Sequence, residues 1–108
     1  MPSVTLCRLE EIPDPGGIDL EIDGEACFAV RRGQSVYLFR NRCPHVGLPL
    51  NLIPGRFLDY DRQYIQCSSH GALFEIDSGH CIAGPCHGQH LESLPCQVLD
   101  GQLVWQPG

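Results

Sequence analysis

Two short cysteine–histidine pairs constrain this chain more than any other feature of its sequence. The first pair is Cys43-Pro44-His45 and the second is Cys67-Ser68-Ser69-His70. Each pair offers one thiolate and one imidazole within a few residues, so each can act as one metal-binding loop. Two sulfur and two nitrogen ligands suit either a zinc ion or an iron–sulfur cluster. The pairs therefore predict a metal centre shared by two loops.

The spacing within the pairs favours a cluster over zinc. Structural zinc sites more often combine a Cys-x-x-Cys pair with a later pair, and a Cys-x-His spacing is unusual among them. A zinc site with the same four ligands and a site that no longer holds metal remain alternatives. Gly47 and Gly71 follow the two histidines, and glycine lets the backbone approach a bound group closely. We expect amides at these positions to donate hydrogen bonds to cluster sulfurs.

The residues around the pairs resemble those of the Rieske family. The first pair continues as Val46-Gly47-Leu48-Pro49-Leu50, the second as Gly71-Ala72-Leu73-Phe74, and Ala83-Gly84-Pro85 follows. In that family two histidines replace two cysteines on one iron of a [2Fe–2S] cluster. The resemblance, which extends over nearly the whole chain, implies that Cys43 and Cys67 bind one iron and that His45 and His70 bind the other.

The details of the loops resemble soluble Rieske-type ferredoxins more than the Rieske proteins of cytochrome bc-type complexes. In those complexes each loop carries an additional cysteine and the two form a disulfide, but here the positions hold Leu48 and Ser69. The Ser and Tyr hydroxyls beside that cluster correspond to Ala72 and Phe74. Fewer hydrogen bonds to the sulfurs leave the reduced state less stabilised. We expect a potential toward the bottom of the Rieske range of roughly −150 to +300 mV.

The resemblance also implies a function. Soluble Rieske-type ferredoxins carry single electrons from a flavin reductase to an oxygenase or a similar enzyme, and the exposed edges of His45 and His70 would be the electron port. The sequence shows no mononuclear iron triad and no Rossmann fingerprint, so we expect an electron carrier without its own substrate site. The alternatives are a small Rieske-like subunit of a larger oxidoreductase such as assimilatory nitrite reductase, a zinc-stabilised interaction module, and an iron–sulfur sensor.

Length and charge limit the other possibilities. A chain of 108 residues is sufficient for one core, and we expect a single domain over residues 1–108 with a cluster-binding lobe at about residues 42–86. The formal charge is −6 and all cations are arginine, which argues against nucleic-acid or anionic-membrane binding. No apolar stretch reaches the ~18 residues of a membrane span, and the first residues do not resemble a signal peptide. We expect a cytoplasmic protein.

Acidic residues and surplus cysteines raise two further questions. Seven of the thirteen acidic residues lie between Glu10 and Glu25, either as a solvated edge or as a docking face for a basic partner. Without an export signal, the remaining cysteines are expected to be thiols, most of them small buried hydrophobes. These are Cys7, Cys27, Cys81, Cys86 and Cys96. Cys86 follows Gly84-Pro85, where the Rieske resemblance implies a loop covering the cluster, so a packed thiol near the centre or near Cys81 is expected.

Hydrophobic periodicity predicts an all-β fold. Residues 18–22 alternate between apolar and acidic, residues 26–30 are almost continuously apolar, and Asp23-Gly24 between them is a hairpin signal. The other predicted strands are 4–9, 36–39, 64–66, 73–76, 80–82, 97–99 and 103–105. Within residues 52–63, Arg56, Asp59, Asp61 and Arg62 are predicted to form an exposed excursion. Together with the resemblance, the pattern predicts an antiparallel Rieske-type (ISP) domain with a small cluster-binding lobe.

Overall fold

The computed structural model describes residues 3–44, 49–51, 55–68 and 71–106. Apart from one short 3-10 helix, η1 (Leu9–Glu11), the regular structure in these segments is β-strand, which confirms the all-β prediction. The strands are β1 (Val4–Arg8), β2 (Gly16–Ile22), β3 (Glu25–Arg32), β4 (Ser35–Arg40), β5 (Tyr64–Gln66), β6 (Leu73–Glu75), β7 (Cys81–Ala83), β8 (Ser93–Leu94), β9 (Cys96–Leu99) and β10 (Gln102–Trp105). None of the described segments is a helix that is long and apolar enough to cross a membrane.

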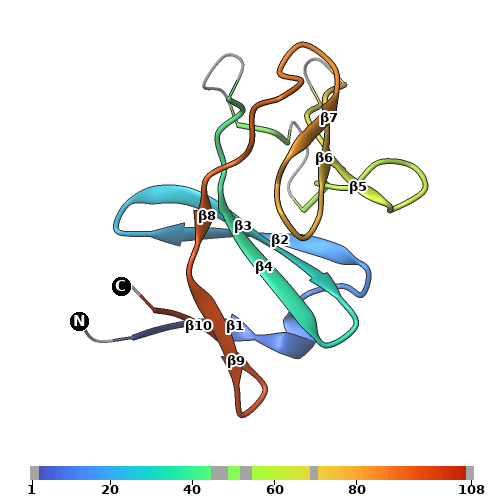
Figure 1. The fold of residues 1–108 in the computed structure, drawn as a ribbon. Helices are drawn as coiled ribbons and strands as arrows, with labels where there is room; N and C mark the ends of the chain where they lie inside the picture. Colours follow the sequence, from blue (N-terminus) through green and yellow to red (C-terminus); the bar gives the residue numbers. More distant parts are fainter. Residues whose placement is uncertain (1–2, 45–48, 52–54, 69–70, 107–108) are drawn as a thin grey trace.

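The strands form three antiparallel sheets. One sheet has the order β1-β10-β9, the second β2-β3-β4-β8 and the third β5-β6-β7. Figure 1 shows the β5-β6-β7 sheet as a separate small lobe on one side of the β2-β3-β4-β8 sheet, with both chain ends near β1 and β10 at the opposite end of the molecule. The four-stranded sheet is therefore the middle layer of the protein.

The position of β3 between two core clusters explains why its sequence is apolar without alternation. Cys27 and Ala29 lie in a core cluster together with Leu103 of β10, whereas Phe28 and Val30 lie in the cluster that contains the small lobe. Successive side chains of a strand point to opposite faces, so a strand buried on both faces is apolar at nearly every position. The four residues from Cys27 to Val30 are at most 1% exposed.

The hairpin predicted from Asp23-Gly24 is present, and Asp100-Gly101 forms a second one. Ile22 pairs with Glu25 across the first turn and Leu99 with Gln102 across the second. The turn residues have positive φ, 52° and 80° at Asp23 and Gly24, and 51° and 74° at the second turn. This is the requirement of a type I′ hairpin, which Asp-Gly meets at little cost.

The excursion after the first ligand loop is exposed at Arg56, Asp61 and Arg62, as predicted, and half-buried at Asp59. The burial of Phe57 was not predicted: this residue is 1% exposed and its ring stacks on that of Phe28, with centroids 4.4 Å apart. Leu58 bridges to Ile65 of β5. One large aromatic side chain is enough to attach the segment to the sheet, because burying it removes about 150–250 Å² from water. Tyr60, three residues after Phe57, is 99% exposed, so this part of the excursion is open to solvent.

Two further elements were not predicted. Strand β8 pairs Leu94 with Leu38 of β4, and a strand of two residues is too short to show any periodicity. The 3-10 helix η1 follows β1 directly, and its first turn is held by the Glu11 carboxylate, which accepts a hydrogen bond from the amide of Arg8. Cys7 and Cys96 are half-buried rather than buried, since they lie on the outer sheet.

Candidate metal centre

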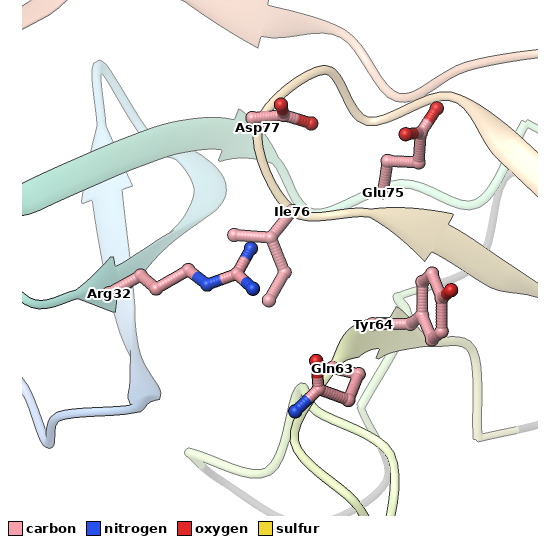
Figure 2. A pocket seen from close by; sticks show the side chains of 6 residues that line it. All are labelled: Arg32, Gln63, Tyr64, Glu75, Ile76 and Asp77. Carbon is pink, nitrogen blue, oxygen red and sulfur yellow. The ribbon is translucent and has the colours of Figure 1, made fainter.

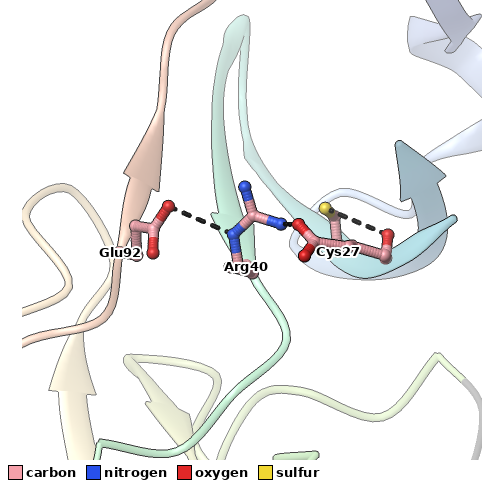
Figure 3. A network of polar contacts seen from close by, with 4 residues as sticks. Cys27, Arg40 and Glu92 are labelled. Carbon is pink, nitrogen blue, oxygen red and sulfur yellow. Dashed lines mark hydrogen bonds and ion pairs between the residues drawn. The ribbon is translucent and has the colours of Figure 1, made fainter. Parts of the chain in front are cut away.

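The first ligand loop begins on a stem that is fixed on both sides. Arg40 ends β4, and its amide donates a hydrogen bond to the carbonyl of Glu92, while its guanidinium contacts the carboxylates of Glu92 and Glu25. Figure 3 shows the Arg40 guanidinium joined to Glu92 by a dashed line. Glu25 begins β3 and Glu92 immediately precedes β8, so the two acids come from different segments. Cys43, three residues further on, is fully buried. The stem thus delivers the first predicted thiolate ligand into the core of the small lobe.

The second ligand loop leaves β5 at Cys67, which is 1% exposed. The amide of Cys67 donates to the carbonyl of Ala72, and the amide of Gly71 donates to the carbonyl of Cys67. The expectation that the Gly71 amide donates to a cluster sulfur is therefore wrong, because this amide closes the loop on itself. The remaining ligands of the prediction, His45 and His70, lie outside the described residues, as do Gly47, Leu48 and Ser69.

The two loops are joined by a backbone hydrogen bond. The amide of Ser68, next to Cys67, donates to the carbonyl of Leu50 at 2.8 Å. Cys43 and Cys67 consequently belong to one buried cluster of side chains. Two buried thiols on adjacent loops are a suitable donor set for the iron of an iron–sulfur cluster, which prefers thiolate ligands.

The positions that carry hydroxyls in cytochrome bc-type Rieske proteins are apolar and buried. Ala72 and Phe74 are both 0% exposed and lie in the same cluster as Cys43 and Cys67. Neither side chain can donate a hydrogen bond to a cluster sulfur. The environment beside the thiols is therefore hydrophobic.

A third loop covers this cluster. Gly84 lies directly against Ala72, since a Cβ at Gly84 would be 2.8 Å from the Ala72 Cα. The loop is closed by backbone hydrogen bonds from Cys81 to the carbonyl of Gln89 and from Gln89 to the carbonyl of Cys86. The segment following β7 is thus a compact turn packed on the second ligand loop.

Cys81 and Cys86 form a chain of hydrogen-bonded thiols within the covering loop. The Cys86 Sγ donates to the Cys81 Sγ at 3.1 Å, and the Cys81 Sγ donates to the carbonyl of Ala83 at 3.2 Å. Burial raises the pKa of Cys86 to about 12, and the hydrogen bond to Cys81 and the charges of Cys81 and Cys43 act in the same direction. Cys86 therefore stays protonated and packed, as expected, and its contact is with Cys81.

Within the described residues, no three or more His, Cys, Asp or Glu side chains are grouped to hold a metal ion.

The other three histidines are surface residues. His80, His87 and His90 are all exposed. His80 and His90 face each other across an isolated antiparallel bridge next to the covering loop. No role in metal binding follows from their positions.

A shallow pocket of about 190 Å³ lies where the small lobe meets the end of β3. It is lined by Arg32, Gln63, Tyr64, Glu75, Ile76 and Asp77. Figure 2 shows Arg32 extending from the end of β3 toward Ile76, with Tyr64 at the start of β5 and Gln63 immediately before it. Neither Cys43 nor Cys67, the two predicted ligands among the described residues, lines this pocket.

The acidic segment near the N-terminus serves the fold at several points. Asp14 accepts a hydrogen bond from the amide of Gly33, Asp19 accepts one from the amide of Gly55, and Glu25 pairs with Arg40. These carboxylates hold neighbouring loops and strands in place. Their contacts favour the interpretation of this run as a solvated structural edge.

Asn41 is the important residue that sequence reasoning missed. It is 9% exposed, and its side chain holds the amide of Leu50 with a hydrogen bond of 2.8 Å. The sequence marked it only as the end of a strand. A polar residue immediately before a loop that must be buried was the available signal, because buried amides need partners.

Comparison with known proteins agrees with this arrangement. The Rieske [2Fe-2S] domain family matches residues 3–98. The fold is similar to that of the ferredoxin of carbazole 1,9a-dioxygenase from Nocardioides aromaticivorans IC177, with a TM-score of 0.82, 22% identity and 100% coverage of both chains. It is also similar to a putative NADPH nitrite reductase small subunit, with a TM-score of 0.74, 21% identity, and coverage of 98% of this chain and 99% of that one.

A relative with a known activity matches over part of its length. Cholesterol 7-desaturase of Caenorhabditis elegans is 28% identical over 81 residues, which make up 74% of this chain and 18% of the desaturase. The chain therefore corresponds to less than a fifth of that protein.

Proposed function

Because this chain belongs to the Rieske [2Fe-2S] domain family, whose cofactor is a [2Fe–2S] cluster, we propose that it carries single electrons between redox proteins. The cluster is held by Cys43 and Cys67 on one iron and by His45 and His70 on the other. The observation that supports this proposal is the burial of both thiols in one cluster of side chains on two hydrogen-bonded loops. We place this cluster-binding lobe at about residues 42–86 of a single domain over residues 1–108.

The ligand set determines how readily the centre accepts an electron. When bound, the cluster supplies one-electron redox chemistry, and two thiolates rather than four leave its oxidised form without net charge. Cys43 and Cys67 are buried, so water is excluded from their sulfur atoms. The imidazoles of the other iron carry outward nitrogens that can exchange protons, so electron and proton uptake can be coupled.

The partners we propose are a flavin reductase as donor and an oxygenase or similar enzyme as acceptor. The likeness to a dioxygenase ferredoxin over the full length of both chains supports this choice. Electrons would pass through the imidazoles of His45 and His70, and Pro49 and Pro85, which are exposed, would contribute to the docking surface. A small apolar patch of this kind suits brief docking, as in other weak redox encounters. The place of action we propose is the cytoplasm.

A low midpoint potential is part of the proposal. Ala72 and Phe74 are buried beside the ligand thiols and provide no hydroxyl, so the reduced cluster receives fewer hydrogen bonds. The formal charge of −6 acts in the same direction, because negative charge disfavours the addition of an electron. A redox titration should therefore place the midpoint toward the lower end of the range of roughly −150 to +300 mV. A midpoint well above zero would contradict this part of the proposal.

A second candidate function is that of a small subunit in a larger oxidoreductase. The likeness to a putative nitrite reductase small subunit, which also covers nearly the whole of both chains, favours it. The two candidates share the cluster and differ in the partner. A subunit should co-purify stably with a large chain, whereas a carrier should bind its partners only briefly.

The proposal is tested on purified protein. We expect about two irons and two acid-labile sulfides per chain, a visible spectrum that bleaches with dithionite, and an EPR signal in the reduced state. A zinc-containing, colourless protein would refute it. The carrier role is tested by reduction of the protein with NAD(P)H and a flavin reductase, followed by oxidation by an oxygenase.

A further inference from the structure

The buried side chain of Asn41 joins the two ends of the first ligand loop. The Asn41 Oδ1 accepts a hydrogen bond from the amide of Leu50 at 2.8 Å, and the amide of Asn41 donates to the carbonyl of Ala26 on β3. Asn41 lies two residues before Cys43, and Leu50 follows Pro49. The bond therefore ties the beginning of the loop to its end and both to the central sheet.

The same residue reaches the second ligand loop. The carbonyl of Leu50 accepts a hydrogen bond of 2.8 Å from the amide of Ser68, the residue after Cys67. Asn41 holds the backbone of Leu50 through its amide and Ser68 holds it through its carbonyl, so a displacement of Asn41 is passed to the second loop through Leu50. Asn41 consequently influences the position of both ligand-bearing loops.

The chain of hydrogen bonds continues to the edge of the sheet. The Asn41 Nδ2 donates to the Asn51 Oδ1 at 2.9 Å, and the Asn51 Nδ2 donates to the Asp19 Oδ1 at 2.9 Å. The other oxygen of Asp19 accepts a hydrogen bond of 2.6 Å from the amide of Gly55. This carboxylate thus joins β2 to the segment that follows the first ligand loop.

The groups at the two ends of this series of hydrogen bonds determine in which direction each bond donates. The Leu50 amide can only donate and an ionised Asp19 can only accept, so Asn41 and Asn51 must each accept on one side and donate on the other. The orientation of both side-chain amides follows from this requirement. A carboxylate in place of either amide would leave one of the bonds without its donor.

We propose that Asn41, Asn51 and Asp19 form a positioning relay that fixes the separation of the two ligand loops, and so sets the midpoint potential and the lifetime of the bound cluster. The inference rests on the proposed function, in which both loops hold the cluster. Residues outside the ligand set tune a metal by orienting the loops and by setting hydrogen bonds around it. The three residues are therefore positioning residues and do not bind the cluster.

The test compares amide-to-acid substitutions of equal charge. Asn41→Asp keeps the acceptor for Leu50 and loses the donor to Asn51. Gln106→Glu is the matched control, because its Nε2 also donates to a side-chain oxygen, that of Gln97 at 2.9 Å, beyond β10. Asn51→Leu breaks the relay without adding charge, and it remains informative if Asn41→Asp does not fold.

Three measurements apply to each variant. These are the midpoint potential and reduced-state EPR spectrum, the decay of the visible absorbance, and hydrogen exchange of the Leu50 and Ser68 amides. We expect Asn41→Asp and Asn51→Leu to shift the potential and the EPR g values and to shorten the cluster lifetime. Both variants lose the hydrogen bond between the side chains at positions 41 and 51, which holds the acceptor of the Leu50 amide in place, so exchange of the Leu50 and Ser68 amides should be about tenfold faster, the effect of losing one buried hydrogen bond. Gln106→Glu should behave as wild type.

Two results would overturn the relay. One is wild-type exchange and an unaltered EPR spectrum in Asn51→Leu. The other is a potential that shifts in Asn41→Asp without faster exchange at Leu50 and Ser68, since that would be the effect of the added charge alone. A wild-type protein without a reduced-state EPR signal would instead refute the proposed function, and the relay with it.

Discussion

Gly84 offers a direct test of how the covering loop is packed on the second ligand loop. An alanine Cβ at this position would lie 2.8 Å from the Cα and 3.1 Å from the Cβ of Ala72. Overpacking of this kind costs about 1–3 kcal/mol. The φ of +100° at Gly84 adds the backbone strain of an L residue, about 1–2 kcal/mol. Gly84→Ala should therefore lower the free energy of unfolding by about 2–5 kcal/mol.

Gly88 in the same loop provides the matched control. Its φ is +91°, but a Cβ there would meet no atom within 4 Å. Gly88→Ala should therefore cost only the backbone strain, about 1–2 kcal/mol. The difference between the two variants isolates the contact with Ala72.

The assay is urea denaturation of the holoprotein, followed together with the loss of cluster absorbance. We expect both the unfolding midpoint and the cluster lifetime to fall further in Gly84→Ala than in Gly88→Ala. Adding Ala72→Gly should rescue Gly84→Ala only in part, because it removes the neighbouring Cβ but leaves the Cα at 2.8 Å. Equal losses in Gly84→Ala and Gly88→Ala would refute the packing argument.

The remaining predictions concern the core, the alkaline limit and the ligands. Phe57→Ala should destabilise the protein by about 3–5 kcal/mol in urea denaturation, because it removes a buried ring stacked on Phe28. Tyr60→Ala, at a 99% exposed position, should change the free energy of unfolding by no more than about 0.5 kcal/mol. Similar losses in the two variants would be inconsistent with the burial of Phe57. Burial raises the pKa of Cys27 above its ordinary value of 9.0. The contribution of this thiol to the free energy of unfolding is therefore fully present below pH 9.0. It declines at higher pH, because the thiol of the unfolded chain loses its proton first. The free energy of unfolding should fall less steeply above that pH in Cys27→Ala, and an unchanged slope would contradict the assignment. His70→Cys should lower the midpoint potential by adding a negative ligand, and an intact cluster with an unchanged midpoint would show that His70 is not a ligand.

Much of the strand arrangement could be predicted because its determinants are local. Asp23-Gly24 specifies a hairpin by its own backbone preferences, and the apolar run at residues 26–30 indicates a strand covered on both faces. β8 could not be predicted, because a two-residue strand exists only where β4 offers it a partner. Phe57 could not be placed either, since its burial depends on the ring of Phe28, 29 residues earlier in the sequence.

For the candidate site, the sequence by itself supplied the donor types: two thiols and two imidazoles on two short loops, a set that suits a zinc ion or an iron–sulfur cluster, with apolar residues at the neighbouring positions. Residue types and short spacings can be read along the chain, so they predict a metal centre, and the assignment of the four ligands stays a prediction. The tertiary structure alone decided how the loops are held, through Asn41, Leu50 and Ser68, and that the Gly71 amide closes its own loop. Hydrogen bonds between segments distant in sequence depend on where the folded chain brings each donor and acceptor, and no local pattern specifies those positions.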